Sequence, residues 1–230
     1  MKFGFDLISD LELLDTDTFD WEGKPTSLFC LIAGNISDDL HVLQKVLRHL
    51  SKCYQGVFFI DGALENPDIN FRDHRIKELT KLCSSIHNVV YLHNNVVIVD
   101  GIALIGLNGW SDNVLVYTDA DSFQAKCNRY EDIVYLQKTL EKLQLHVDVK
   151  KIVILSSSIP SPHFYFGESS SKDELYPINV LGTDTEGKVV HWCFGTYNKL
   201  VDMNINGVNY INNPKIDRDP YYAKRIEVDV

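Results

Sequence analysis

The sequence predicts an α/β fold, because apolar strand-like runs alternate with helix-like segments along all 230 residues. The strand-like run at 57–60 is short and entirely apolar, whereas Leu43, Leu47 and Leu50 recur at the spacing of one helix face. Neither an internal repeat nor an interdomain linker interrupts the alternation. Residues 1–230 are therefore expected to form a single domain.

The elements follow in order from periodicity and from the residues that begin or end them. Strands are expected at 2–8, 28–33, 57–60, 88–92, 96–99, 102–106, 151–155 and 189–194, and a hairpin at 201–211. Helices are expected from the Ser37–Asp39 cap to about Cys53, over His74–Ile86 and over Asp121–Leu145. Gly, Asp and Thr at 181–188 indicate a turn. Residues 215–230 are expected to form a charged surface tail that docks on the domain or on a partner.

Five short segments each follow one of the apolar runs. They are Ser9–Leu13 (SDLEL), Ala33–Asn35 (AGN), Asp61–Glu65 (DGALE), Ser156–Pro162 (SSSIPSP) and Phe194–Asn198 (FGTYN). Their order and spacing resemble the calcineurin-like metallophosphoesterase superfamily. That pattern reads Asp-x-His, Gly-Asp, Gly-Asn-His-Glu, a His before Pro-Ser-Pro, and Gly-His-x-His.

Further landmarks extend the resemblance over roughly residues 3–216. Gly106–Asp112 is similar to the Gly-x-x-x-Trp segment of the family, and Gly207–Pro214 is similar to its closing strand and Asn-Pro turn. The resemblance implies two facing mixed β-sheets flanked by helices, a four-layer α/β/β/α sandwich. One departure is the turn at 181–188, where the family has a full helix before its last motif.

The chemistry of the family depends on ligands that this sequence mostly lacks. Active members hold two metal ions roughly 3.5–4 Å apart, which clamp a phosphoryl group and generate a hydroxide nucleophile. Asp10 remains, but Asn35 replaces the bridging Asp and, being neutral, cannot offset the repulsion between two cations. The other ligand and catalytic positions carry Glu12, Ala63, Leu64, Ser157 (or Ser158), Thr196 and Asn198. The resemblance therefore implies a degenerate member with no catalytic residue.

Two interpretations of the remaining polar residues stay open. Asp10, Glu12, Asn35 and Asn198 could form an oxygen-only site for a single divalent cation such as Mg²⁺, Mn²⁺ or Ca²⁺. Alternatively, they are only polar residues at strand ends. Because every His ligand is lost, we expect no bound metal or other cofactor.

A run of aromatic residues suggests a protein-binding site. Phe164, Tyr165 and Phe166 directly follow the Pro160–Pro162 turn, in what is expected to be a loop beside the former metal site. Loops lie on the surface, and aromatic side chains are enriched at interface hot spots. Alternatively, Phe164 and Phe166 fold down to cap the sheets.

The net charge and the acidic loops indicate which class of partner the protein would bind. The formal net charge is −10, and the loops beside the former site carry many acids, namely Asp10, Glu12, Asp15, Asp17, Asp38, Asp39, Asp61, Glu65 and Asp68. Without metals these loops would repel nucleic acid and attract a basic protein partner. Alternatively, the acids only keep the protein soluble.

The remaining bulk properties exclude a membrane protein. No apolar run approaches the ~20 residues of a membrane helix, and no signal peptide is visible. Five scattered cysteines fit reduced thiols in the cytoplasm, or in the host cytoplasm if the protein is viral, an origin that suits a stripped enzyme fold.

The function expected from these observations is that of a pseudoenzyme. It would be a catalytically inactive protein that serves as a protein-binding scaffold or assembly subunit, or that self-associates. The alternative is a residual or rewired metal-dependent phosphoesterase.

Overall fold

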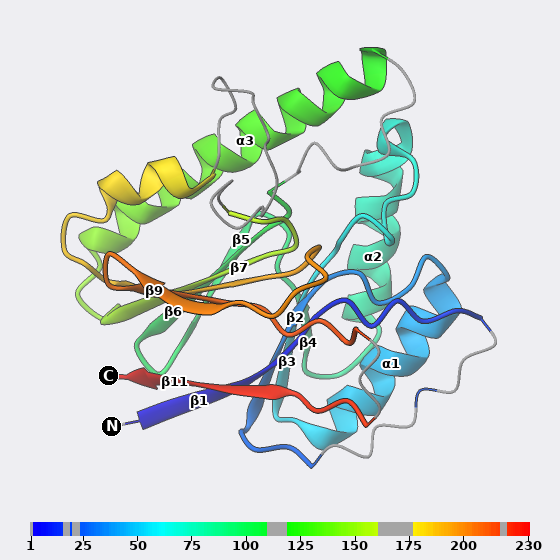
Figure 1. Cartoon of the computed structure of the whole chain (residues 1–230), viewed down its shortest axis with the longest axis horizontal. Coiled ribbons are helices and arrows are strands. Elements are labelled where there is room, and N and C mark those ends of the chain that lie inside the picture. Colours follow the sequence, from blue (N-terminus) through cyan, green and yellow to red (C-terminus); the bar gives the residue numbers. More distant parts are fainter. Residues whose placement is uncertain (1, 16–18, 20–23, 110–118, 161–176, 217–219) are drawn as a thin grey trace.

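Two mixed β-sheets lie face to face between layers of helix in the computed structural model (Figure 1). The structure describes residues 2–15, 19, 24–109, 119–160, 177–216 and 220–230. The first sheet has the strand order β11-β1-β2-β3-β4, in which only β11 is antiparallel to its neighbour. Its strands are β1 (Lys2–Ile8), β2 (Phe29–Ala33), β3 (Gly56–Ile60), β4 (Val89–Tyr91) and β11 (Lys224–Asp229).

The second sheet has the order β5-β6-β7-β8-β10-β9. Its four central strands are parallel, and the edge strands β5 and β9 pair antiparallel with β6 and β10. The strands are β5 (Asn95–Val99), β6 (Ile102–Leu107), β7 (Lys151–Ser156), β8 (Val189–Phe194), β9 (Asp202–Ile205) and β10 (Val208–Ile211). β4 and β5, which are consecutive in the chain, thus belong to different sheets.

Three apolar cores hold the layers together. Helices α1 (Leu40–Cys53) and α2 (Arg72–Ser84) pack on the outer face of the first sheet, and α3 (Asp119–Gln144) packs on that of the second. A third core, which includes Phe5 and Leu104, fills the space between the sheets. The predicted four-layer α/β/β/α sandwich is confirmed.

The helices begin and end close to the predicted positions. Asp39 caps α1, because its side chain accepts hydrogen bonds from the backbone N–H groups of His41 and Val42. A short 3₁₀ helix, η1 (Ile69–Phe71), leads into α2. Another 3₁₀ helix, η3 (Pro177–Thr183), precedes a turn, so the described residues between 177 and β8 contain no α-helix, as expected.

The predicted surface tail at 215–230 needs correction. Lys224–Asp229 form β11, which pairs with β1 along six residues. Ile226 and Val228 are buried in the core between the sheets, while the charged residues that alternate with them, Arg225, Glu227 and Asp229, are exposed. This period-two alternation is the pattern of a half-buried strand, which explains why the segment completes the sheet.

No helix within the described ranges is both long enough and apolar enough to span a bilayer.

Candidate functional site

The candidate site lies where parallel strands of both sheets end. The segments that follow β1, β2 and β3 leave the first sheet at one edge, and those after β7 and β8 leave the second. A hydrogen bond between the sheets closes the site, because the Thr196 N–H donates to Asp10 Oδ1 at 2.7 Å. All five motif-like segments therefore meet in one place, since Leu64 and Glu65 of the third segment also contact Asn35. We call four of the residues that meet here the Asp10 cluster (Asp10, Asn35, Ser157 and Thr196).

Close backbone packing explains why the motif glycines remain. Gly34 has φ +75°, and a Cβ there would lie 2.8 Å from the Gly62 backbone nitrogen. A Cβ on Gly195 would collide with the Ala33 carbonyl oxygen. The framework of the site thus tolerates no side chain at these turns.

The backbone of the site also has an uncommon conformation. Asp10, Glu12, Asn35 and Thr196 all have positive φ, between 49° and 56°. Such conformations cost free energy in non-glycine residues, most of all in a β-branched residue such as Thr196. The fold therefore retains a strained loop geometry of the kind that is concentrated at functional sites.

The Asn35 amide lies at the centre of the Asp10 cluster. Its Nδ2 donates to Asp10 Oδ1 at 2.9 Å and to Thr196 Oγ1 at 2.8 Å. Its Oδ1 accepts from the Leu64 N–H at 3.1 Å, and Thr196 Oγ1 donates to the Ser157 carbonyl at 2.7 Å. Asp10 Oδ1 thus accepts two hydrogen bonds, one from the Asn35 amide and one from the Thr196 backbone N–H.

Glu65 keeps a structural role in the same region. Its fully buried carboxylate accepts hydrogen bonds from the backbone N–H groups of Asn35, Ile36, Ser37 and Gly62, at 2.7–3.3 Å. Burial raises the pKa of Glu65, although these N–H groups act in the opposite direction. The carboxylate fixes the loop after β2 against the loop after β3.

The structure does not bring together all four candidate metal ligands, Asp10, Glu12, Asn35 and Asn198. Asp10 and Asn35 are buried and in contact, whereas Glu12 and Asn198 are exposed. In the described residues no group of three or more His, Cys, Asp or Glu side chains is placed to hold a metal ion. The donor set does not fit a dinuclear metal centre, because an amide N–H group, which cannot ligate, points at the one remaining Asp.

Burial controls the protonation of Asp10. It raises the pKa of Asp10 from 3.8 to about 7, although hydrogen bonds from Asn35 and Thr196 act in the opposite direction. Asp10 Oδ2 is buried and has no hydrogen-bond partner among the described residues. The carboxyl group is therefore expected to bind a proton below neutral pH.

This shift predicts a pH-dependent stability. The folded state binds the Asp10 proton more tightly than the unfolded state, so this contribution to stability is lost as pH rises from about 4 to about 7. Asp10→Asn removes the titration. The free energy of unfolding of the variant, relative to wild type, should rise by on the order of 2–4 kcal/mol between pH 4 and pH 8. Urea unfolding at several pH values measures this difference, and a difference independent of pH would contradict the assignment.

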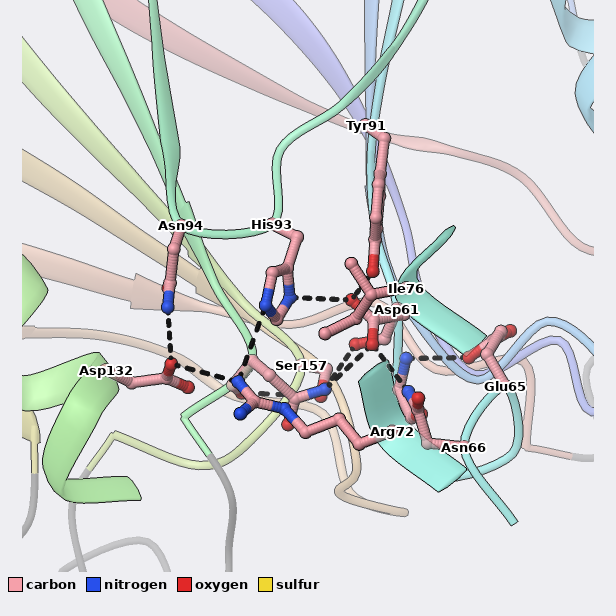
Figure 2. A network of polar contacts seen from close by, with 12 residues as sticks. Asp61, Glu65, Asn66, Arg72, Ile76, Tyr91, His93, Asn94, Asp132 and Ser157 are labelled. Atoms are coloured by element: carbon pink, nitrogen blue, oxygen red, sulfur yellow. Dashed lines mark hydrogen bonds and ion pairs between the residues drawn. The ribbon is translucent and has the colours of Figure 1, made fainter. Parts of the chain in front are cut away.

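A second polar network lies beside the Asp10 cluster and was missed by the sequence analysis (Figure 2). We call it the Asp61 network, and it contains Asp61, Arg72, Tyr91, His93 and Asp132. The Tyr91 hydroxyl donates to Asp61 Oδ1 at 2.7 Å, and His93 Nδ1 lies 3.5 Å from the same atom. Burial alone would raise the pKa of Asp61, but hydrogen bonds from His93, Tyr91 and Asn66 lower it below its ordinary value.

Arg72 connects this network to α3. Its guanidinium lies 3.8 Å from the buried Asp132 carboxylate, 3.3 Å from Glu131 and 3.4 Å from His93 Nε2. A neutral His93 with its proton on Nδ1 directs that N–H toward Asp61 Oδ1, 3.5 Å away, and leaves Nε2 to accept from Arg72. Burial raises the pKa of Asp132, partly offset by the Gly109 N–H, Asn94 and Arg72. The network therefore ties α2, α3 and the β4–β5 connection together.

Two further predictions concern the aromatic protein-binding run and the acidic loops beside the site. The aromatic run Phe164, Tyr165 and Phe166 lies outside the described residues. Of the acids assigned to the surface loops, Asp10, Asp61 and Glu65 are buried and hydrogen-bonded, while Asp39 and Asp68 cap helices. The acidic surface beside the site is therefore smaller than the sequence indicated.

Solved structures with a similar fold include two named hydrolases. The phosphopantetheinyl hydrolase PptH from Mycobacterium tuberculosis has a TM-score of 0.66 and 15% identity, covering 98% of this chain and 96% of that one. A putative 5'-nucleotidase from Staphylococcus aureus has a TM-score of 0.59 and 11% identity. The match covers all of this chain but only 51% of the nucleotidase chain.

A third similar structure is GAP50, described as the anchor in the inner membrane complex of Plasmodium. Its TM-score is 0.56 with 13% identity, covering 94% of this chain and 72% of that one. No model of a protein family matches the sequence, and no curated protein matches it. At these identities the similarity shows the fold alone: the chain has the calcineurin-like metallophosphoesterase fold.

Proposed function

We propose that this chain is a degenerate metallophosphoesterase that no longer hydrolyses phosphoesters and serves as a protein-binding scaffold or assembly subunit. The observation that carries the proposal is the Asn35 amide, which donates to Asp10 Oδ1 and Thr196 Oγ1. A two-metal enzyme needs cations to stabilise the developing charge and to supply hydroxide. In this cluster a neutral amide donates a hydrogen bond to the one remaining carboxylate of the family pattern instead.

One structural neighbour is described as an anchor, which is the kind of role proposed here. GAP50 shares the fold and is described as an anchor, so this architecture is compatible with holding other components in place. The exposed acids Glu12, Asp15, Asp38 and Asp68 would favour the approach of a basic protein partner and disfavour nucleic acid. A second copy of the chain is the other partner class.

A rewired metal-dependent phosphoesterase is the second candidate function. The observation in its favour is Asp10 Oδ2, a buried carboxylate oxygen without a hydrogen-bond partner among the described residues. A single divalent cation such as Mg²⁺ or Mn²⁺ would need several oxygen ligands. Asp10 alone does not provide them, which is why we favour the scaffold.

Asn35→Asp tests the observation that carries the proposal. The change replaces two hydrogen-bond donors by a second carboxylate against Asp10, so we expect a loss of about 2–4 kcal/mol in the free energy of unfolding at pH 8. Added Mn²⁺ should recover part of this loss, because two adjacent carboxylates attract a cation. Chemical unfolding with and without Mn²⁺ measures both effects.

Asn198→Asp is the matched control, since Asn198 is exposed and lies outside the cluster. It should change stability by less than about 0.5 kcal/mol. An Asn35→Asp variant as stable as wild type in the absence of metal would contradict the central role of the amide.

A further inference from the structure

A pocket outside the Asp10 cluster lies between α2 and the edge strand β4. It has a volume of about 370 Å³, within the range of ligand-binding clefts. Ile76, Thr80 and Ser84 line it from α2, spaced at successive helical turns, and Val89, Tyr91 and His93 line it from β4 and the residues that follow. We call this feature the α2–β4 groove.

The backbone of β4 has hydrogen-bonding groups at this edge that no other described strand occupies. β4 is the last strand of the first sheet and pairs only with β3 among the described strands. The Asn88 carbonyl accepts from Val57 N–H and the Leu92 N–H donates to the Phe59 carbonyl, so the even-numbered residues face β3. The alternation of a parallel ladder therefore directs the Val89 carbonyl and both backbone groups of Tyr91 away from β3.

β4 is short, with three residues, but among the described residues it lacks the charged side chains that protect many edge strands against an incoming strand. Edge strands are commonly blocked by charged residues, proline or a bulge. The opposite edge, β11, follows that rule with Lys224, Arg225, Glu227 and Asp229, whereas β4 (Val-Val-Tyr) has no charged residue. The edge beside α2 therefore remains competent to pair.

The helix beside the groove is basic, in a protein of net charge −10. α2 contains four Lys or Arg residues against two Asp or Glu. Arg72 and Arg75 form ion pairs with acids of the chain, whereas Lys77 and Lys81 are exposed and form none with the described residues. Neither lysine lines the groove, but Lys77 and Lys81 each lie three residues before a groove-lining residue, Thr80 or Ser84, so their charges lie next to the lining face of the helix.

We propose that the α2–β4 groove binds an extended, acidic peptide segment of a partner protein, which adds a strand to β4. Main-chain hydrogen bonds to Val89 and Tyr91 would supply affinity, as in other strand-addition complexes. Uncharged side chains of the peptide lie over Ile76 and Thr80, and a carboxylate reaches Lys77 or Lys81. The inference rests on the proposed protein-binding function. It assigns the α2–β4 groove to an acidic segment because the local charge of α2 is basic, whereas the exposed acidic loops elsewhere on the chain favour a basic partner surface.

The test uses a library of random peptides displayed on phage and selected on the whole chain. Selected peptides are then synthesised and titrated calorimetrically. Thr80→Trp fills the groove from an exposed helix position and should lower affinity at least tenfold, and Lys77→Glu with Lys81→Glu should do the same. Gln137→Trp, an equally large change on the exposed face of α3, is the control and should leave affinity unchanged. The amide resonances of Val89 and Tyr91 should shift on binding.

The possible outcomes of these experiments test the groove separately from the proposed protein-binding function. If the selected peptides contain Asp or Glu and bind the Thr80→Trp variant more weakly than wild type, the groove is supported as their binding site. If the peptides bind wild type and Thr80→Trp with equal affinity, the proposal that they bind in the groove is overturned, but a protein-binding role remains in place. Failure to select any peptide overturns the groove as well, while assays of phosphoester hydrolysis decide separately whether catalysis is lost.

Discussion

The purified protein is expected to hydrolyse neither phosphomonoesters nor phosphodiesters when Mn²⁺, Mg²⁺, Zn²⁺ or Ni²⁺ is supplied. Loss of a two-metal clamp removes both hydroxide generation and charge stabilisation, so the rate should fall by many orders of magnitude. The Asn35 amide and the exposed positions of Glu12 and Asn198 leave Asp10 without the partners that such a clamp requires.

Initial rates of hydrolysis of a simple aryl phosphate and of a bis-aryl phosphodiester test this expectation. Asp10→Ala serves as the control for contaminating hydrolases, because it removes the remaining ligand of the family pattern. A turnover of about 1 per second on either substrate, abolished by Asp10→Ala, would overturn the pseudoenzyme proposal.

Arg72→Ala is expected to lower the free energy of unfolding by about 3–5 kcal/mol. The reason is that Asp132, whose side chain is 0% exposed, would lose a cationic neighbour while remaining buried. His93 and Asn128 would each lose a donor as well. Calorimetry or urea unfolding measures the change.

Arg75→Ala is the matched control, because Arg75 lies on the same helix and pairs with the partly exposed Glu78. Loss of the Arg75 side chain should lower the free energy of unfolding by less than about 1 kcal/mol. Equal effects of the two substitutions would show that the Asp61 network does not hold α2 and α3 together.

The fold was predictable because strand and helix periodicities are local and strong. The Leu43–Leu47–Leu50 spacing predicted α1, and the apolar run at 57–60 predicted β3. β11 was also within reach, since Ile226 and Val228 alternate with charged residues, but the density of charge concealed the pattern. The pairing of β11 with β1, more than 200 residues away in sequence, depends on tertiary packing.

The sequence indicated which positions of the candidate site depart from the family pattern, but not which contacts the residues at those positions make. The sequence showed that Asn35 and Thr196 cannot act as the family's ligands, yet their mutual hydrogen bond joins residues 161 positions apart. The Asp61 network was missed for the same reason, as it joins α2, α3 and a connecting loop. One signal was available: His93 lies two residues beyond the carboxyl end of a strand-like run, where functional side chains commonly lie.

Thermal unfolding with and without a chelator tests the central claim most directly. If the Asn35 amide satisfies the cluster in place of metal, the melting temperature should be the same with chelator and with excess Mn²⁺, Mg²⁺ or Zn²⁺. A bound ion would stabilise the folded state by about 2.7 kcal/mol at a hundredfold excess over its dissociation constant. A fall of several degrees with chelator, restored by one particular ion, would contradict the account and favour the rewired metal site.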